Sequence, residues 1–268
     1  MTGKHWMVPA LLLALAVPAW AEPGMGTMQG GDPPADARDP HAYSGGYTRP
    51  ADHPLRLHDE KIFWGVMLDR LETAQGRDNG FNAYDFRGFI GRDYDRLVIK
   101  AEGEVDGGRL QEGRTELLWS HAVAAYWDTQ LGLRHDSGVG PDRTWLAVGV
   151  QGLAPYWFHV DATAYAGEGG RTALRLGAEY EMLLTQRLIL SPRIEANFYG
   201  KRDPALERGA GLADGVFGLR LRYEIRREFA PYIGVEWAGK FGQTADMARD
   251  EGLRTRDTRF VAGVRVWF

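Results

Sequence analysis

The chain has 268 residues, with 32 Lys and Arg, 36 Asp and Glu, and a formal net charge of −4 at pH 7. It contains no cysteine, which excludes a disulfide framework and any cysteine-ligated metal site. The slightly acidic balance gives no basic surface for nucleic acid, so we expect no nucleic acid partner. Its 35 Gly, 9 Trp, 11 Tyr and 11 Phe are typical of many strands joined by tight turns.

Residues 1–21 have the features of a secretory signal peptide. Lys4 gives a positive start, residues 6–17 are largely apolar, and Ala19-Trp20-Ala21 is a small-x-small cleavage site. The alternative is a single membrane-anchoring helix, but the apolar run is shorter than the about 18 residues that such a helix needs. We therefore predict export and cleavage after Ala21.

Residues 22–58 are predicted to form a flexible, disordered arm, because Gly, Pro and Asp dominate and no apolar period is visible. The arm contains two methionines and three histidines, which are Met25, Met28, His41, His53 and His58. Thioether sulfur suits Cu(I), and imidazole suits copper in either oxidation state. Composition alone leaves two interpretations open, a copper-binding arm and a linker that happens to contain these residues.

Residues 59–268 consist of segments in which apolar and polar side chains alternate, the pattern of strands with one apolar face. We count twelve such segments, with ten or fourteen as alternatives, near residues 62–68, 84–90, 97–104, 114–120, 127–134, 146–151, 158–165, 174–182, 190–198, 217–225, 233–237 and 258–268. Segments of about ten residues match a tilted membrane crossing better than the strands of a soluble sandwich. The fold class is therefore an all-β, transmembrane, antiparallel up-and-down barrel.

The connections are predicted to alternate in length, as in outer-membrane barrels. Tight turns are expected at 91–95, 122–125, 153–156, 185–187 and 226–230. Longer polar loops are expected at 73–80, 104–112, 135–143, 200–211 and 241–257, with the short 167–171 as the exception.

The polar face of the strands carries acidic and basic side chains in similar numbers, which we expect to pair across a narrow lumen. Three groups on this face have metal-ligand chemistry, namely Met67, Asp69 and His159. His121 shares the outward face of Trp119 and is expected in an aromatic belt near the membrane surface.

An enzyme is not predicted. A serine nucleophile needs a histidine within hydrogen-bond reach, and the neighbours Ser120 and His121 should face opposite sides of one strand. The chain has no G-x-S-x-G, H-E-x-x-H or P-loop pattern. A lipid-modifying barrel enzyme remains an open alternative.

Several strings resemble the copper resistance protein B family of Gram-negative outer membranes. They are Asp39-Pro-His-Ala-Tyr-Ser44, Leu68-Asp-Arg-Leu-Glu72, Gly152-Leu-Ala-Pro-Tyr-Trp-Phe158, Leu184-Thr-Gln-Arg-Leu-Ile-Leu190, Gly218-Leu-Arg-Leu-Arg-Tyr223, Phe229-Ala-Pro-Tyr-Ile-Gly-Val-Glu-Trp237 and Gly263-Val-Arg-Val-Trp-Phe268. The resemblance implies an outer-membrane barrel that acts in copper resistance beside a periplasmic multicopper oxidase. Family members often have a longer Met- and His-rich N-terminal region than this chain.

We therefore predict a non-enzymatic barrel in outer-membrane lipid, with its N-terminal arm in the periplasm, that binds copper ions for export or sequestration. Copper would be bound or transported rather than serve as a catalytic cofactor. It would meet the five ligands of the arm first and then Met67, Asp69 and His159 in the lumen. The alternative function is a general small-solute porin.

The last segment, Thr258–Phe268, is expected to close the barrel by pairing with the first strand around residues 62–68. Phe260, Ala262, Val264, Val266 and Phe268 would face lipid, while Arg265 would face the lumen. By resemblance, the terminal Phe268 is the aromatic end signal that barrel assembly machinery takes up.

Overall fold

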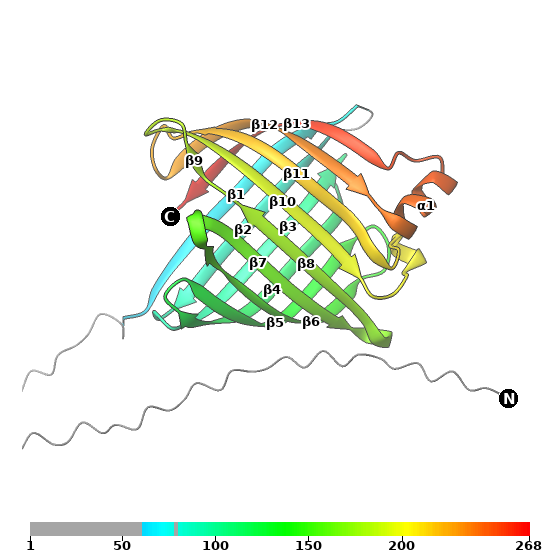
Figure 1. The fold of residues 1–268 in the computed structure, drawn as a ribbon, viewed down its shortest axis with the longest axis horizontal. Coiled ribbons are helices and arrows are strands. Elements are labelled where there is room, and N and C mark those ends of the chain that lie inside the picture. Colours follow the sequence, from blue (N-terminus) through cyan, green and yellow to red (C-terminus); the bar gives the residue numbers. More distant parts are fainter. Residues whose placement is uncertain (1–60, 78–79) are drawn as a thin grey trace, which may run out of the picture. The chain divides into compact units, whose positions relative to one another are not determined.

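The computed structural model describes residues 61–77 and 80–268, which form one antiparallel sheet closed into a barrel (Figure 1). Its strands are β1 (Phe63–Gln75), β2 (Gly80–Gly91), β3 (Asp95–Asp106), β4 (Arg109–Ala124), β5 (Trp127–Gly138), β6 (Arg143–Ala154), β7 (Phe158–Gly167), β8 (Arg171–Glu179), β9 (Met182–Leu183), β10 (Leu188–Tyr199), β11 (Gly211–Tyr223), β12 (Phe229–Lys240) and β13 (Arg256–Trp267). The predicted signal peptide and the whole of the predicted arm lie outside the described residues.

Each strand pairs with its neighbours in chain order, and β13 pairs with β1 to close the ring. The short β9 pairs with β10 in line with β8, from which only Tyr180 and Glu181 separate it. Because β8 and β9 occupy one position in the ring, the barrel has the twelve strand positions that the sequence predicts. The predicted fold class and the closure of the first strand on the last are confirmed.

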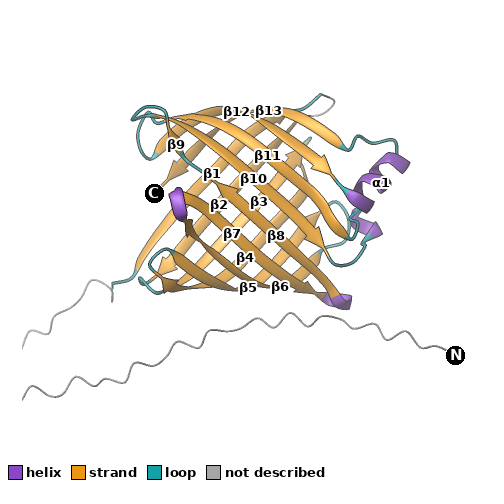
Figure 2. Ribbon diagram, in the orientation of Figure 1, coloured by secondary structure: helices purple, strands orange, loops and turns teal. Residues whose placement is uncertain are grey.

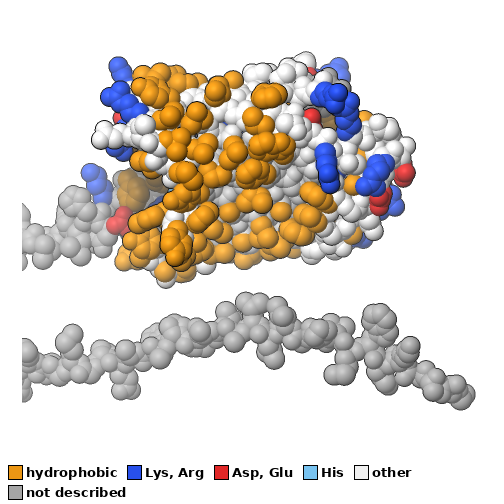
Figure 3. Space-filling view, turned by 45° about the horizontal axis from the view of Figure 1, so that its top comes forward, with side chains coloured by type: hydrophobic (Ala, Val, Ile, Leu, Met, Phe, Trp, Pro, Cys, Tyr) orange, Lys and Arg blue, Asp and Glu red, His pale blue; other side chains and the backbone are white. Residues whose placement is uncertain are grey.

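The outer wall of the barrel is a continuous apolar surface, which Figure 3 shows as a broad orange band between ends that carry the charged side chains. Phe260 on β13 is 68% exposed and Ile233 on β12 is 64% exposed. Trp119, Leu131 and Val148 are exposed on the same surface. An apolar band of this extent is stable in lipid and not in water, so the strands span a membrane.

One irregularity in β1 changes which of its side chains face inward. The pairing register shifts between Leu68 and Leu71 against β13, and between Leu68 and Arg70 against β2. Such a bulge inserts one extra residue, so Asp69 and Arg70 both face the lumen and Glu72 follows them there. Simple alternation along the sequence placed Asp69 correctly but did not anticipate Arg70 and Glu72.

The five predicted tight turns and the short connection at 167–171 are confirmed, but three of the five predicted longer loops are short as well. Between the strands that the structure describes, long connections occur only at 200–210 and 241–255, both at the end of the barrel opposite the chain's C-terminus. The loop predicted at 104–112 is instead a tight hairpin, because Gly107 and Gly108 adopt φ values of +55° and +79° that suit a two-residue turn. We call this end the loop end, and the end with turns 92–94, 125–126 and 155–157 the turn end.

The two long connections pack on each other at the loop end. Loop 241–255 contains the helix α1 (Gly242–Asp250), which lies against the ends of β11 and β12 (Figure 2). The backbone N–H of Gly209 donates to Thr244 Oγ1 over 2.9 Å, and that of Ala210 to Gln243 Oε1 over 3.1 Å. Among the helices of the described residues, none is long and apolar enough to cross a membrane.

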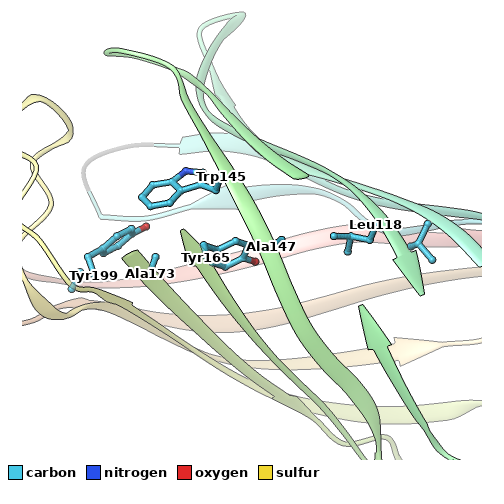
Figure 4. Packing of buried hydrophobic residues seen from close by; sticks show 8 residues of the cluster. Leu118, Trp145, Ala147, Tyr165, Ala173 and Tyr199 are labelled. Atoms are coloured by element: carbon cyan, nitrogen blue, oxygen red, sulfur yellow. The ribbon is translucent and has the colours of Figure 1, made fainter. Parts of the chain in front are cut away.

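Part of the interior is filled by an aromatic cluster that contacts buried charges. Trp145, Tyr165 and Tyr199 point inward and pack with Leu118 and small residues of neighbouring strands (Figure 4). The guanidinium of Arg134 lies 4.4 Å from the centroid of the Tyr165 ring, so this buried cation is stabilised by the aromatic face. The cluster's residues come from both sides of the barrel, from β3 and β4 through β6, β7 and β8 to β10 and β11.

The C-terminal residue takes part in closing the barrel. Phe268 donates its N–H to the carbonyl of Val66 over 2.8 Å and accepts from the N–H of Val66 over 3.1 Å. Its side chain is exposed on the turn end. We expect Phe268→Asp to deplete the protein from outer-membrane fractions, because it places a charge in the interfacial band and removes the predicted end signal. Immunoblots of membrane fractions would measure this, and normal assembly of the variant would contradict it.

Candidate functional site in the barrel lumen

The lumen contains two cavities with a layer of charged side chains between them. The larger has a volume of about 530 Å3 and is lined near the turn end by Arg96, Tyr126 and other residues. The smaller has a volume of about 210 Å3 and lies at the loop end. We call them the turn-end cavity and the loop-end cavity. Arg70, Arg193 and Arg220 line both, so they lie in the layer that separates them.

We call this layer the partition, and it consists of Arg70, Glu72, Asp85, Glu102, Arg114, Arg175, Arg193, Glu195, Arg220 and Glu236. Glu102 on β3 accepts from Arg114 (Nη1–Oε1, 2.7 Å) and from Arg175 on β8 (Nη2–Oε2, 2.8 Å). Because β3 and β8 lie on opposite sides of the ring, the contact with Arg175 crosses the lumen. Arg175 also donates to Glu195 over 2.8 Å, which extends this series of ion pairs. The predicted pairing of charges across the lumen is confirmed.

A second group of ion pairs fixes β1 to β11 and β12. Glu72, only 4% exposed, accepts from Arg220 Nε over 3.0 Å and from Arg220 Nη2 over 2.8 Å. The hydroxyl of Tyr232 donates to the same carboxylate over 2.9 Å, and Arg220 also donates to Glu236 over 2.9 Å. A buried carboxylate with this many donors is well compensated, so losing one partner is expected to be costly.

The three lumen residues predicted as metal ligands come together in one place. Met67, Asp69 and His159 all line the turn-end cavity. Two of them are engaged by one cation, since Arg265 donates to the Met67 sulfur over 3.5 Å and lies 3.1 Å from the Asp69 carboxylate. Arg265 also donates to Glu181 over 2.7 Å. A metal ion would therefore compete with Arg265 for Met67 and Asp69, whereas His159 is free of it.

The ligands predicted in the arm lie outside the described residues, and they are Met25, Met28, His41, His53 and His58. Within residues 61–77 and 80–268, no three His, Asp or Glu side chains are arranged to hold a metal ion. The lumen residues thus provide separate donors around a cavity rather than a closed metal cage.

Three further residues line the turn-end cavity. The alternation of side chains along their strands places them on the inner face, but the sequence does not mark them as part of a site. Arg87 on β2, Asp161 on β7 and Glu179 on β8 line the cavity beside His159. Among the described residues, none of these four side chains has a hydrogen-bond or salt-bridge partner. His159 and Glu179 are direct cross-strand partners, which places their side chains side by side. Partnerless charges cannot be recognised before the pairing of all the others is known.

At the loop end, loop 200–210 is fixed over the mouth of the barrel by Asp203. Its carboxylate accepts from Arg143 Nε over 3.0 Å and lies 3.2 Å from Arg171 Nε. Burial opposes the ionisation of Asp203, but the hydrogen bond and charge of Arg143, with the charge of Arg171, lower its pKa below the usual 3.8. A lowered folded-state pKa means that this stabilisation is complete above pH 3.8 and is lost as pH falls through the folded-state pKa.

We therefore expect the loop to open only at pH below 3.8 in the native protein, which hydrogen exchange of residues 200–210 would detect. Asp203→Asn removes the same charge at every pH. Hydrogen bonds to charged groups contribute about 1.5–3 kcal/mol, so tryptic cleavage after Lys201 or Arg202 at neutral pH should become at least about tenfold faster. Asp246→Asn is the control, because Asp246 pairs only with the exposed Arg249. Equal cleavage of both variants would show that Asp203 does not hold the loop.

The fold and the lumen together define a membrane-spanning β-barrel whose polar interior is interrupted by ion pairs. Residues 62–268 match the family model described as copper resistance protein B precursor. The chain is 48% identical to copper resistance protein B of Escherichia coli, over 79% of this chain and 72% of that protein. It is 41% identical to a copper resistance protein B homolog of Pseudomonas syringae pv. tomato, over 97% of this chain and 95% of that protein.

The chain belongs to the copper resistance protein B family, as its sequence predicts. Membership gives it a role in copper resistance and, together with the barrel, a place in the outer membrane. Among solved structures, the KdgM porin aligns with a TM-score of 0.44 and 13% identity, over 76% of this chain and 99% of that chain. The NanC porin aligns with a TM-score of 0.47 and 10% identity, over the same shares.

Proposed function

We propose that the barrel binds copper ions and contributes to copper resistance by exporting or sequestering them, without acting as an enzyme. The observation that carries the proposal is the presence of Met67, Asp69 and His159 in one cavity at the turn end. The strand that carries Met67 and Asp69 is also the strand into which the arm leads along the chain. A set of ligands that includes a thioether, an imidazole and a carboxylate can bind copper in either oxidation state.

In this proposal the arm lies in the periplasm and offers Met25, Met28, His41, His53 and His58 as the first ligands. Copper then passes to the turn-end cavity. Weak, separate donors favour transfer, because a tight closed cage would hold the ion. A periplasmic multicopper oxidase of the same resistance system is the proposed partner on that side.

Arg265 sets the affinity of the lumen donors in this proposal. It neutralises Asp69 and contacts the Met67 sulfur, so copper must displace a guanidinium that still keeps Glu181 as its partner. The lumen site is therefore weaker than its ligands alone would make it. Such a site would fill only when the copper concentration is high.

We expect His159→Ala to weaken Cu(I) binding to the full chain at least tenfold, whereas Arg265→Gln should strengthen it by exposing Met67 and Asp69. Isothermal titration under reducing conditions would measure both. The control is His135→Ala, because His135 is exposed on the outward-facing side of β5 and hydrogen-bonds Thr144. If Cu(I) binding is unchanged in the His159 and Arg265 variants, copper does not bind in the lumen. If Cu(I) binding is unchanged in a variant with both Met25→Ala and Met28→Ala, these two methionines are not copper ligands.

The alternative of a general porin requires a continuous water-filled lumen, and the partition argues against it. The alternative of a lipid-modifying enzyme requires Ser120 and His121 to meet. Ser120 is buried on the inner face and donates to Asp128, while His121 lies on the outer face beside Asp95, 2.9 Å away. These placements support a non-enzymatic barrel.

A further inference from the structure

On two opposite walls, the turn-end cavity carries charges that have no hydrogen-bond or salt-bridge partner among the described residues. Arg87 lies on β2, while Asp161 and Glu179 lie on β7 and β8. In the ring of strands, β2 and the pair β7 and β8 are on opposite sides. Figure 1 shows β7 and β8 in the foreground with β2 and β3 behind them. If the side chains that already form ion pairs are left out, the β2 side of the cavity is cationic and the side of β7 and β8 is anionic.

A second cation without an acidic partner strengthens the cationic wall. Arg96 on β3 lines the same cavity and donates only to the backbone carbonyls of Arg92 and Asp93, over 3.4 and 3.0 Å. Its guanidinium also lies over the rings of Phe63 and Phe89. It is thus held in place without being neutralised.

These groups differ from the lumen charges that form ion pairs. Arg222 and Arg265 both reach Glu181, and every acid and base of the partition has an oppositely charged partner within 4.0 Å. A narrow lumen favours such pairing, because an uncompensated charge is costly where water is limited. The sequence nonetheless separates Arg87 from Asp161 and Glu179 by the width of the barrel. A ligand that carries both charges would compensate the two walls at once.

We propose that the turn-end cavity binds a small zwitterionic solute of the amino-acid class. Its carboxylate would lie against Arg87, since a guanidinium group binds a carboxylate in a bidentate manner, and Arg96 would add positive charge nearer the turn end. Its ammonium group would lie against Asp161 and Glu179. The volume of about 530 Å3 is within the range of small-molecule sites. A simple anion would meet two repelling carboxylates, and a simple cation two repelling guanidinium groups.

The test uses the purified full chain in detergent with a chelator present, so that it is independent of copper. The probes are 4-aminobutyrate, butyrate and butylamine, which differ only in the charged groups at their ends. We expect 4-aminobutyrate to give saturable binding in isothermal titration and each singly charged probe to bind at least tenfold more weakly. Arg87→Gln and Asp161→Asn should each weaken 4-aminobutyrate binding about tenfold, and Arg87→Lys should retain most of it.

The control variant is Arg109→Gln, an exposed arginine at the loop end that should leave binding unchanged. Heat-modifiable migration on gels would verify that each variant is a folded barrel. Butylamine binding as tight as 4-aminobutyrate would overturn the proposal in favour of a simple cation site. Absence of saturable 4-aminobutyrate binding, or equal binding by the Arg87→Gln variant, would show that the two walls are only hydrated. Neither result would affect the copper titrations, because Arg87 and Asp161 are not among the proposed copper ligands.

Discussion

Replacing Glu72 with glutamine is expected to destabilise the barrel by about 3 kcal/mol, because it leaves the buried Arg220 without its main partner. The Glu72 carboxylate accepts hydrogen bonds from Nε and Nη2 of Arg220 and from the hydroxyl of Tyr232. A glutamine side chain has one acceptor oxygen, and its amide group would point donors at a guanidinium. Arg220 would keep only Glu236, at 2.9 Å. Urea unfolding in detergent micelles, followed by tryptophan fluorescence, would measure the loss.

The matched control is Glu104→Gln, which removes another inward-facing acid of the same barrel. The Glu104 side chain is 42% exposed and lies 3.7 Å from its partner Arg259. Solvent-exposed pairs contribute less than about 1 kcal/mol, so this variant should be close to the native protein in stability. Equal effects of the two substitutions would mean that lumen water solvates Arg220 as well as it solvates Arg259.

The barrel itself could be predicted from the sequence, because lipid outside and charge inside impose a strict period of two. In β13 the exposed Phe260 and the buried Val261 are neighbours, and the alternation continues to Arg265 in the lumen. The same rule placed Met67 and His159 on the inner face, and the structure brings both to one cavity. The pairing of β13 with β1 also followed, since a closed barrel has no edge strands.

Other features depend on contacts between strands and were not readable. The bulge at Asp69 and Arg70 interrupts the period, and only the spacing of Leu68 and Leu71 hints at it. The hairpin at Gly107 and Gly108 looks like part of a polar loop, because its strands continue beyond the apolar band. The local sequence shows which residues are polar and which side of a strand they face. The bulge and the hairpin depend instead on how neighbouring strands pair.

The same limit applies to the candidate site. Asp69 has ligand chemistry, yet Arg265 occupies it from a strand that is joined to β1 only in the folded ring. Conversely, Asp161 and Glu179 resemble the many other inward acids, and their lack of partners emerges only when every ion pair is placed. Which lumen charges are structural and which are available for a ligand is therefore a property of the whole ring.

Removing the carboxylate of Glu102 is expected to open the partition and raise the ion conductance of the barrel several-fold. Glu102 is the acid shared by Arg114 and Arg175, with Arg70 at 4.0 Å. In Glu102→Ala these three cations would repel one another across a lumen of low effective dielectric, and their side chains would move apart. The remaining excess of guanidinium groups should also favour anions. Planar bilayer recordings in a KCl gradient would give both the conductance and the reversal potential.

Glu112→Gln is the control, because Glu112 is 75% exposed at the loop end and lies 3.9 Å from its nearest cation, Arg208. It should leave conductance and selectivity close to those of the native barrel. A native barrel that already conducts as strongly as Glu102→Ala would show that the partition does not block ions, and it would favour the general porin. A closed native barrel that opens when one carboxylate is lost would instead mean that copper entering the turn-end cavity cannot leave through the loop end until these ion pairs rearrange. In its closed state the protein would then bind and release copper only through the turn end. Export would require a second state in which the partition is open.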